Sequence, residues 1–375
     1  MLNLMKNNYF KLMSETTQIT KPLIWDCLTT IEEDKLRRTV LFYPKSRFSK
    51  RGLFLRPLLI RLSYEAAGGN DWKNIVPIYA AYELLNISTY QANLSFDKKR
   101  GVSTSSEINN QFISSMITRE LAQNLVYEKL HDSLYLDRLL DSINKINLHI
   151  YKGQFYDLNV LHKDNWEGFK TMHEYMEVYN KKCLYLSGIF FQECAYIGSI
   201  LGENRNNVAV PLSNFGRYFG IGLHIVNDIA NFIPINNFTG EDKDVYADLK
   251  NNRLTLPIYY LLRYGSEYDR GKFIKLWNSK PITNDTCFNM VQILINSEAI
   301  YYAKKIAKIF MKKAKQCLTD LENDEISANL STMVSVLKSN KYFNFLNRMH
   351  SVKNEMFPVE STRVIESILH DYTTT

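Results

Sequence analysis

The stretch that decides the fold runs from His224 to Pro257 and reads HIVNDIANFIPINNFTGEDKDVYADLKNNRLTLP. It places Asn227, Asp228 and Asn231 at i, i+1 and i+4, which on a helix puts the two asparagines on one face with the aspartate beside them. Their oxygen atoms are ligands that hard cations such as Mg²⁺ prefer. A polar, basic loop and a proline-led apolar helix follow. This order suits a metal-bound diphosphate. An amide-rich helix end followed by a solvated loop, with no ligand at all, gives the same pattern.

The 375-residue chain has the composition of a globular and mostly helical protein. Hydrophobic residues make up 45% and charged residues 23%, which argues against disorder. With only 15 Gly and 9 Pro, few turns and long helices are expected. Apolar residues such as Trp25, Leu28 and Ile31 recur at helical spacing, and no run alternates as a strand would. We predict one large all-α domain at residues 21–375, preceded by a loosely held polar tail at residues 1–20.

The charge and cysteine patterns narrow the classes of partner and compartment. A net charge of +7 fits small anionic substrates, and no compact basic and aromatic motif indicates a nucleic-acid partner. The five cysteines are scattered and lack metal-type spacing, as expected for reduced thiols. The sequence shows no secretory signal and no uninterrupted apolar stretch of membrane-spanning length. We therefore expect a cytoplasmic protein without a transmembrane segment.

Four further stretches carry charged or polar residues in patterns that suit diphosphate chemistry. Taken singly, each is a weak indication, because a buried lysine or carboxylate is more often paired structurally than catalytic, so their order along the chain carries the argument. They are Arg56 at the entry of the helix that Pro57 opens, Lys99-Arg100-Gly101 after Asn93 and Asp97, Gly153-Gln154-Phe155-Tyr156-Asp157-Leu158, and Lys181-Lys182-Cys183.

This order resembles the trans-isoprenyl diphosphate synthase (polyprenyl synthetase) family across roughly residues 50–265. The family's G-Q-x-x-D-L is unchanged at 153–158, and its K-T appears as Lys182-Cys183. Its F-Q-x-x-D-D-x-x-D falls on 223–231, and its D-L-x-x-G-K-x-T-L-P on 248–257. The resemblance implies the all-α isoprenoid synthase fold, a large single-domain helical bundle whose two aspartate-rich helices face each other across a deep central cavity.

The family's metal-binding motifs are altered in this chain. Anchored on the upstream Ala81-Tyr82-Glu83-Leu84, the first D-D-x-x-D falls on residues 93–97; anchored on the downstream basic residues, it falls on 90–94, which hold no carboxylate. We prefer the first alignment because it keeps an i, i+4 pair, although it requires a short deletion before Lys99. The second motif has asparagine at two of three aspartate positions. The resemblance implies Mg²⁺ as cofactor, with the ligands Asn93, Asp97, Asn227, Asp228 and Asn231.

The family's site for a second, homoallylic diphosphate is expected to be degraded. Its G-K-R-x-R-P aligns without gaps to Gly52-Leu53-Phe54-Leu55-Arg56-Pro57, so two cations are apolar here. Lys50 and Arg51 lie nearby but could substitute only through a local insertion, and the histidine that helps this site is Asn86. The site for the allylic diphosphate is better kept, because Lys182, Asp228 and Arg253 remain and His224 stands where the family has Gln.

These matches predict a set of site residues and three functions. The expected catalytic residues are Asp157, Lys182, Asp228 and Arg253, and the expected substrate-binding residues are Arg56, Lys99, Arg100, Gln154, Lys182, His224, Lys243 and Arg253. The favoured function is an Mg-dependent enzyme that ionises one prenyl diphosphate and yields a cyclised terpene or a prenylated non-isopentenyl acceptor. The alternatives are chain elongation with isopentenyl diphosphate and a non-catalytic subunit of such a synthase. The family also implies a homodimer.

Overall fold

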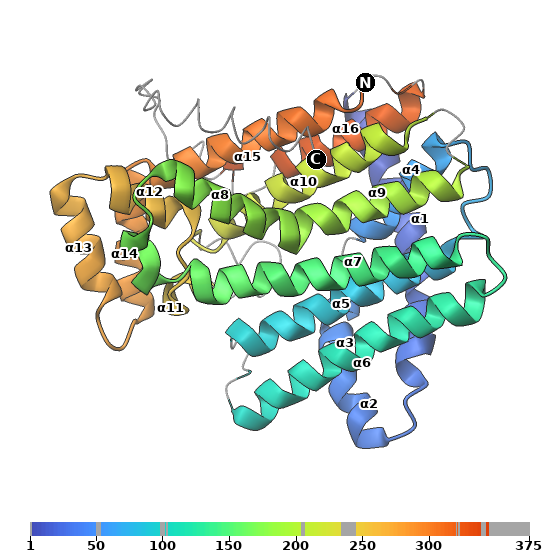
Figure 1. The fold of residues 1–375 in the computed structure, drawn as a ribbon, viewed down its shortest axis with the longest axis horizontal. Coiled ribbons are helices and arrows are strands. Elements are labelled where there is room, and N and C mark those ends of the chain that lie inside the picture. Colours follow the sequence, from blue (N-terminus) through green and yellow to red (C-terminus); the bar gives the residue numbers. More distant parts are fainter. Residues whose placement is uncertain are drawn as a thin grey trace.

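The chain is almost entirely helical in a computed structural model that describes residues 2–49, 54–97, 102, 104–203, 207–233, 245–319, 321, 323–338 and 343–344. Within these ranges there are sixteen α-helices and no strand, so the all-α prediction is confirmed (Figure 1). The helices are α1 (Leu2–Thr29), α2 (Asp34–Val40), α3 (Phe42–Ser49), α4 (Leu55–Ala66), α5 (Val76–Asp97), α6 (Ser105–Leu130), α7 (Leu136–Phe155), α8 (Met172–Cys183), α9 (Ile189–Leu201), α10 (Ala209–Ala230), α11 (Ala247–Lys250), α12 (Leu256–Tyr264), α13 (Glu267–Trp277), α14 (Asn284–Asn296), α15 (Ala299–Gln316) and α16 (Asp324–Lys338).

Helix α10 packs most extensively against α9 and α15. Glycine allows α10 to approach the preceding helix closely, because a Cβ on Gly220 would lie 2.7 Å from the carbonyl oxygen of Ser187. This close packing brings the last turns of α10, with His224 and Asp228, beside the end of α8, where Lys182 lies. A larger side chain at residue 220 would force the two backbones apart.

A π-helical turn at Leu184–Gly188 joins α8 to α9. The backbone stays helical through this turn, so Met172–Leu201 is one continuous helical stretch. Its length and apolar composition would suffice to cross a membrane. However, 67% of its most apolar window is buried inside the bundle, as in the core helix of a globular protein.

The prediction of a loosely held tail at residues 1–20 is wrong. Helix α1 begins at Leu2 and continues past Pro22 to Thr29, and it packs against α4, α5 and α16. Tyr9 and Met13 are buried in the core, and Thr16 and Thr20 are also buried. The two threonine hydroxyls donate to carbonyls of the preceding turn, which satisfies their hydrogen bonds inside the helix. The Thr-rich composition therefore did not prevent a buried helix.

The ends of α5, α7 and α10 and the segment after α11 come together toward one end of the bundle (Figure 1). Helix α7 continues into a π-helical turn at Tyr156–Val160. A short antiparallel bridge then joins His162 to Arg253, with Leu254 N–H donating to Leu161 O at 2.8 Å. The bridge fixes the segment after α11 against the segment after α7, and so places Arg253 beside Asp157.

Candidate active site

A buried lysine lies between two carboxylates at this end of the bundle. Lys182 Nζ lies 3.1 Å from Asp157 Oδ1 and 3.0 Å from Asp228 Oδ2, and only 3% of the lysine side chain is exposed. Burial by itself would lower the pKa of Lys182, but Asp228 and Asp157 raise this pKa further than burial lowers it. The ammonium group therefore stays charged in the interior. Three helical segments, α7 with its π-helical extension, α8 and α10, contribute one residue each to this arrangement.

Arg253 extends the same cluster to the end of α5. Its Nη2 donates to Asp97 Oδ1 at 3.0 Å, and its Nε lies 3.3 Å from Asp157 Oδ2. Asp157 thus contacts both cations. Burial would raise the pKa of Asp157, but Lys182 and Arg253 lower it below its ordinary value, so the carboxylate stays ionised. We name the chain of contacts Asp97–Arg253–Asp157–Lys182–Asp228 the Lys182 network.

Asp228 has two further neighbours. Tyr179 donates its hydroxyl to Asp228 Oδ2 at 2.8 Å, and His224 Nε2 lies 3.7 Å from Oδ1. The other ring nitrogen of His224, Nδ1, lies 3.1 Å from Ser187 Oγ. Burial, which outweighs the attraction of Asp228, lowers the pKa of His224 to about 4. His224 is therefore neutral at pH 7 and acts as a hydrogen-bonding group rather than as a cation.

The asparagines predicted as metal ligands lie within four residues of Asp97 or Asp228 along the chain. Asn93 lies one helical turn before Asp97, and Asn227 adjoins Asp228; both are half-buried, and neither side chain has a hydrogen-bond partner within the described ranges. Asn231 donates its amide to Asp248 Oδ2 at 2.7 Å. Asp97 reaches Arg253, whereas Tyr90 is 40% exposed and stacks on Tyr43. These positions favour the alignment of the first motif on residues 93–97.

Two predicted binding residues lie outside the Lys182 network. Arg56 lies over the rings of Phe190 and Phe191, with its guanidinium carbon 4.3 and 4.7 Å from their centroids. Gln154 is buried one turn before Asp157 and contacts no member of the network through a hydrogen bond. Lys99, Arg100 and Lys243, together with Lys50 and Arg51, lie outside the described residues.

Sequence reasoning missed Tyr179 and gave Asp248 no role. Tyr179 precedes Lys182 by three residues, so helical spacing alone puts both side chains on one face of α8. Asp248 is the first residue of a family motif in the sequence. Its side chain contacts Asn231, which stands where the family has aspartate, and so brings a carboxylate next to that position. The tyrosine could have been found from its spacing, whereas Asn231 and Asp248 are 17 residues apart and no spacing predicts their contact.

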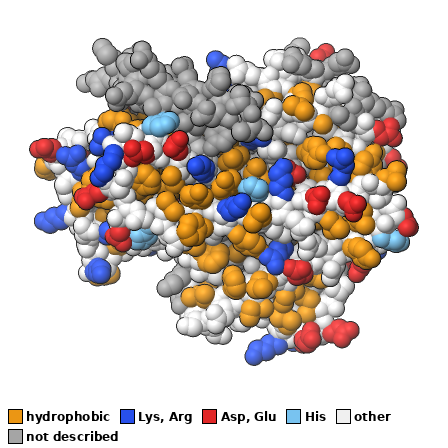
Figure 2. Space-filling model, in the orientation of Figure 1, with side chains coloured by type: hydrophobic (Ala, Val, Ile, Leu, Met, Phe, Trp, Pro, Cys, Tyr) orange, Lys and Arg blue, Asp and Glu red, His pale blue; other side chains and the backbone are white. Residues whose placement is uncertain are grey.

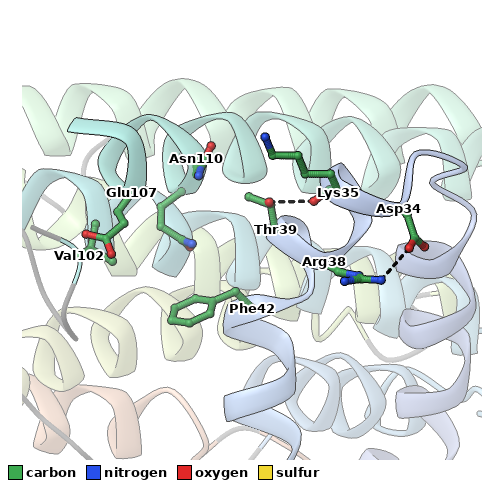
Figure 3. A pocket seen from close by; sticks show the side chains of 9 residues that line it. Asp34, Lys35, Arg38, Thr39, Phe42, Val102, Glu107 and Asn110 are labelled. Atoms are coloured by element: carbon green, nitrogen blue, oxygen red, sulfur yellow. Dashed lines mark hydrogen bonds and ion pairs between the residues drawn. The ribbon is translucent and has the colours of Figure 1, made fainter. Parts of the chain in front are cut away.

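A cavity of about 550 Å³ lies elsewhere, between α2 and the start of α6. Figure 3 shows Glu107 and Asn110 of α6 on one side of it and Asp34, Arg38 and Thr39 of α2 on the other. None of the predicted site residues lines this cavity. The chemistry of the Lys182 network is therefore separate from it.

Comparisons with known proteins agree with the fold and the motifs. The profile of a family described as polyprenyl synthetase matches residues 44–294, well over half of the chain. The geranylgeranyl diphosphate synthase of Methanosarcina mazei is 22% identical over 309 residues, which cover 80% of this chain and 90% of that relative. The heptaprenyl diphosphate synthase component 2 of Bacillus subtilis is 23% identical over 180 residues, or 48% of this chain and 49% of the relative.

A solved structure shows the same architecture. The polyprenyl synthase of Caulobacter crescentus, crystallised with calcium and isoprenyl diphosphate, superposes with a TM-score of 0.77. The match covers 90% of this chain and 98% of that one at 15% sequence identity. At this identity the likeness establishes the fold alone, and the prediction of an isoprenoid synthase fold is confirmed.

Proposed function

Because this chain belongs to the polyprenyl synthetase family, we propose that it is a chain-elongating prenyltransferase, which joins an allylic prenyl diphosphate to isopentenyl diphosphate. The sequence alone favours an enzyme that acts on one prenyl diphosphate. The relatives from Methanosarcina mazei and Bacillus subtilis, however, are named as diphosphate synthases, which supports chain elongation over that reading.

The observation that carries the proposal is the Lys182 network. Its two cations connect Asp97 at the end of α5 to Asp228 on α10. When an allylic diphosphate ionises, negative charge develops on the leaving diphosphate, and fixed cations stabilise it most in a site that excludes water. Lys182 is held charged in such a buried site. We assign Lys182 and Arg253 to the leaving group, and Asp157 and Asp228 to holding these cations in place.

The oxygen donors around the network fit a divalent cation only if amides take part. No three His, Cys, Asp or Glu side chains in the described part of the chain lie close enough to form a metal site alone. The half-buried amides of Asn93 and Asn227 have no hydrogen-bond partner there, and hard cations accept amide oxygen as well as carboxylate. We assign these two residues with Asp97, Asp228 and Asn231 to a divalent cation, Mg²⁺ by the family resemblance. Such a cation supplies positive charge to the diphosphate.

The test is incorporation of labelled isopentenyl diphosphate. The purified chain is incubated with Mg²⁺ and with dimethylallyl, geranyl, farnesyl or geranylgeranyl diphosphate as primer. We expect a longer labelled prenyl diphosphate with at least one primer, and no product from the Asp228→Ala variant. No incorporation with any primer would rule chain elongation out.

An enzyme that uses one prenyl diphosphate is the second candidate, and it is favoured by the apolar side chain at residue 54. Phe54 is fully buried where the family has arginine in its second-substrate motif. An allylic cation that met no isopentenyl diphosphate would cyclise or alkylate another acceptor. Release of diphosphate and a new hydrocarbon or alcohol product, with isopentenyl diphosphate left out, would support this candidate over elongation.

A homodimer is proposed from an exposed apolar face on α6 and α7. Leu148, Tyr151 and Phe155 form one stripe of α7, and each is about half exposed. Phe112, Ile113 and Met116 are similarly exposed on α6. Figure 2 shows hydrophobic side chains gathered on this side of the molecule. A second copy over this face would bury side chains that are otherwise in water. Sedimentation of Tyr151→Glu/Phe155→Glu as a monomer, where the unmodified chain is a dimer, would support this interface.

A non-catalytic subunit is the third candidate, because one matched relative is named as a synthase component. Turnover by the purified chain alone, abolished in Asp228→Ala, would exclude it. We also keep a cytoplasmic location as a proposal, and fractionation of the source cells tests it.

A further inference from the structure

Helix α3 places the side chain of Arg47, of which 15% is exposed, at a position that no sequence motif predicts. Its Nε and Nη2 donate to Glu83 Oε1 on α5 at 3.1 and 2.5 Å, and the carboxylate side chain of Glu83 is fully buried. Asn86, one turn further along α5, donates its amide to the same oxygen at 2.9 Å. Burial would lower the pKa of Arg47, but Glu83 raises it further, so the guanidinium remains a fixed positive charge.

The guanidinium of Arg47 lies against the residue that replaces a family cation. Its central carbon is 5.6 Å from the ring centroid of Phe54 and 5.6 Å from that of Tyr90. Phe54 aligns with an arginine in the second-substrate motif of the family. Aromatic faces attract cations, so the ring at residue 54 contributes to holding a charge that comes from another helix. The charge missing at residue 54 is thus present beside it, at Arg47.

A second guanidinium in this region lacks a partner. Arg56 lies over Phe190 and Phe191, but its Nε is buried without a hydrogen-bond partner, and its side chain forms no ion pair with any described residue. A buried cation without such a partner is costly, and an anionic ligand would satisfy it. Two guanidiniums therefore stand near one carboxylate, that of Glu83, which leaves one positive charge uncompensated. We name these three residues with Phe54 the Arg47 pocket.

The Arg47 pocket lies along the same helix face as the Lys182 network. One face of α5 carries five residues at alternating spacings of three and four positions: Glu83, Asn86, Tyr90, Asn93 and Asp97. At a rise of about 1.5 Å per residue, Glu83 and Asp97 are about 20 Å apart along the axis. An anion bound at Arg47 and another bound near Asp97 would therefore occupy distinct places on one surface.

We propose that Arg47 and Arg56 together bind the diphosphate of isopentenyl diphosphate, and that Arg47 replaces the cation that residue 54 lacks. This assignment rests on the chain-elongating activity proposed above, for which it identifies the site of the second substrate. The guanidinium forks of the two arginines suit phosphate oxygens, which accept paired hydrogen bonds. The degraded motif at residues 52–57 is then compensated by a residue five positions before it.

The experiment compares Arg47→Ala and Arg47→Lys with a matched control. Arg61→Ala also removes a buried arginine that pairs with a carboxylate, Glu65 at 2.8 Å, and that lies over an aromatic ring, Trp72 at 3.7 Å. We measure KM for isopentenyl diphosphate and for the allylic primer separately. We also measure binding of isopentenyl diphosphate alone by calorimetry, which needs no turnover, and check folding by thermal unfolding.

We expect Arg47→Ala to raise KM and Kd for isopentenyl diphosphate at least tenfold, with KM for the primer changed less than twofold. Arg47→Lys should recover part of this loss, and Arg61→Ala should lower only the unfolding temperature. Unchanged binding in a folded Arg47→Ala variant would overturn the assignment while leaving elongation intact. Absence of binding by the unmodified chain would also overturn it. Binding without incorporation into any primer would instead refute the proposed elongation and leave the site standing.

Discussion

The Lys182 network and the Arg47 pocket hold opposite surpluses of charge. In the network, three carboxylates (Asp97, Asp157 and Asp228) contact two cations (Lys182 and Arg253), which leaves a negative excess among these residues. In the pocket, two guanidiniums stand near one carboxylate. A negative excess attracts a cation and a positive excess attracts an anion. The two regions therefore prefer different ligands although they lie along one helix.

The largest expected effect comes from removing the shared cation of the network. Lys182→Met leaves the buried Asp228 without its lysine and leaves Asp157 with Arg253 alone, so the free energy of unfolding should fall by about 3–5 kcal/mol. Turnover should fall at least about 100-fold, because a fixed charge at the leaving group is lost. Urea unfolding and diphosphate release measure the two effects. Lys181→Met removes the exposed neighbour, and equal losses in both variants would contradict the prediction.

The next effect distinguishes the two regions by pH, because a histidine, His224, lies beside Asp228 of the network, whereas the Arg47 pocket contains none. The pKa of His224 is about 4 in the fold, against 6.5 ordinarily, so between these values the unfolded chain binds more protons. Stability should therefore fall as pH decreases from 6.5 to 4, by up to about 3 kcal/mol. Burial lowers the pKa of His224 most, Asp228 and Asp157 raise it in part, and Lys182 lowers it.

The measurement is the unfolding free energy across this pH range at constant ionic strength. In His224→Gln, which carries the residue that the family has at this position, this contribution to the slope should disappear. Identical slopes in the variant and the unmodified chain would show that His224 does not titrate as the structure implies.

A smaller effect sharpens the role of the hydroxyl missed by sequence reasoning. Tyr179→Phe removes the hydrogen bond to Asp228 and keeps the ring stacked on Tyr175, so stability should fall by about 2 kcal/mol. Tyr185→Phe is the matched control, because its hydroxyl has no hydrogen-bond partner in the described part of the chain. If the two variants unfold at the same urea concentration, the hydrogen bond to Asp228 contributes nothing measurable.

The smallest expected effect increases the negative excess of the network. Asn227→Asp restores a family carboxylate at a half-buried position, and the Mg²⁺ concentration for half-maximal activity should fall about tenfold, equal to about 1.4 kcal/mol. Asn231→Asp should gain less, because Asn231 donates to Asp248 and a carboxylate would repel it. A titration with Mg²⁺ tests both variants, and the reverse order would contradict this assignment of the two amides.

Local sequence patterns predicted the helices well where the apolar spacing was strong. The proline-led apolar helix expected after the basic loop forms α12 (Leu256–Tyr264). Asp157, Lys182, Asp228 and Arg253 meet as the order of their motifs suggested. The first twenty residues were misjudged because threonine and other polar residues weaken helix propensity. Burial of Tyr9 and Met13 against other helices outweighs this weakness, and that burial is a tertiary effect.

The Arg47 pocket could not be found from the sequence for a different reason. Arg47 and Glu83 are 36 residues apart, and no periodicity connects a short helix such as α3 to the middle of α5. Alignment of the motif at residues 52–57 shows which cations are missing there. A cation that replaces them from outside the motif can be recognised only from its contacts in the folded chain. Substituted cations of this kind therefore require a structure to be recognised.

Helix α5 limits where residues can be inserted into or deleted from this chain. Each residue inserted into an α-helix turns everything beyond it by about 100° and moves it by about 1.5 Å. An insertion between Glu83 and Asn93 would turn Asp97 away from Arg253 while leaving Glu83 beside Arg47. The preferred alignment places the shortening after residue 97, and α5 ends at Asp97. The change in length therefore falls outside the helix and preserves the angular relation between the two charged regions.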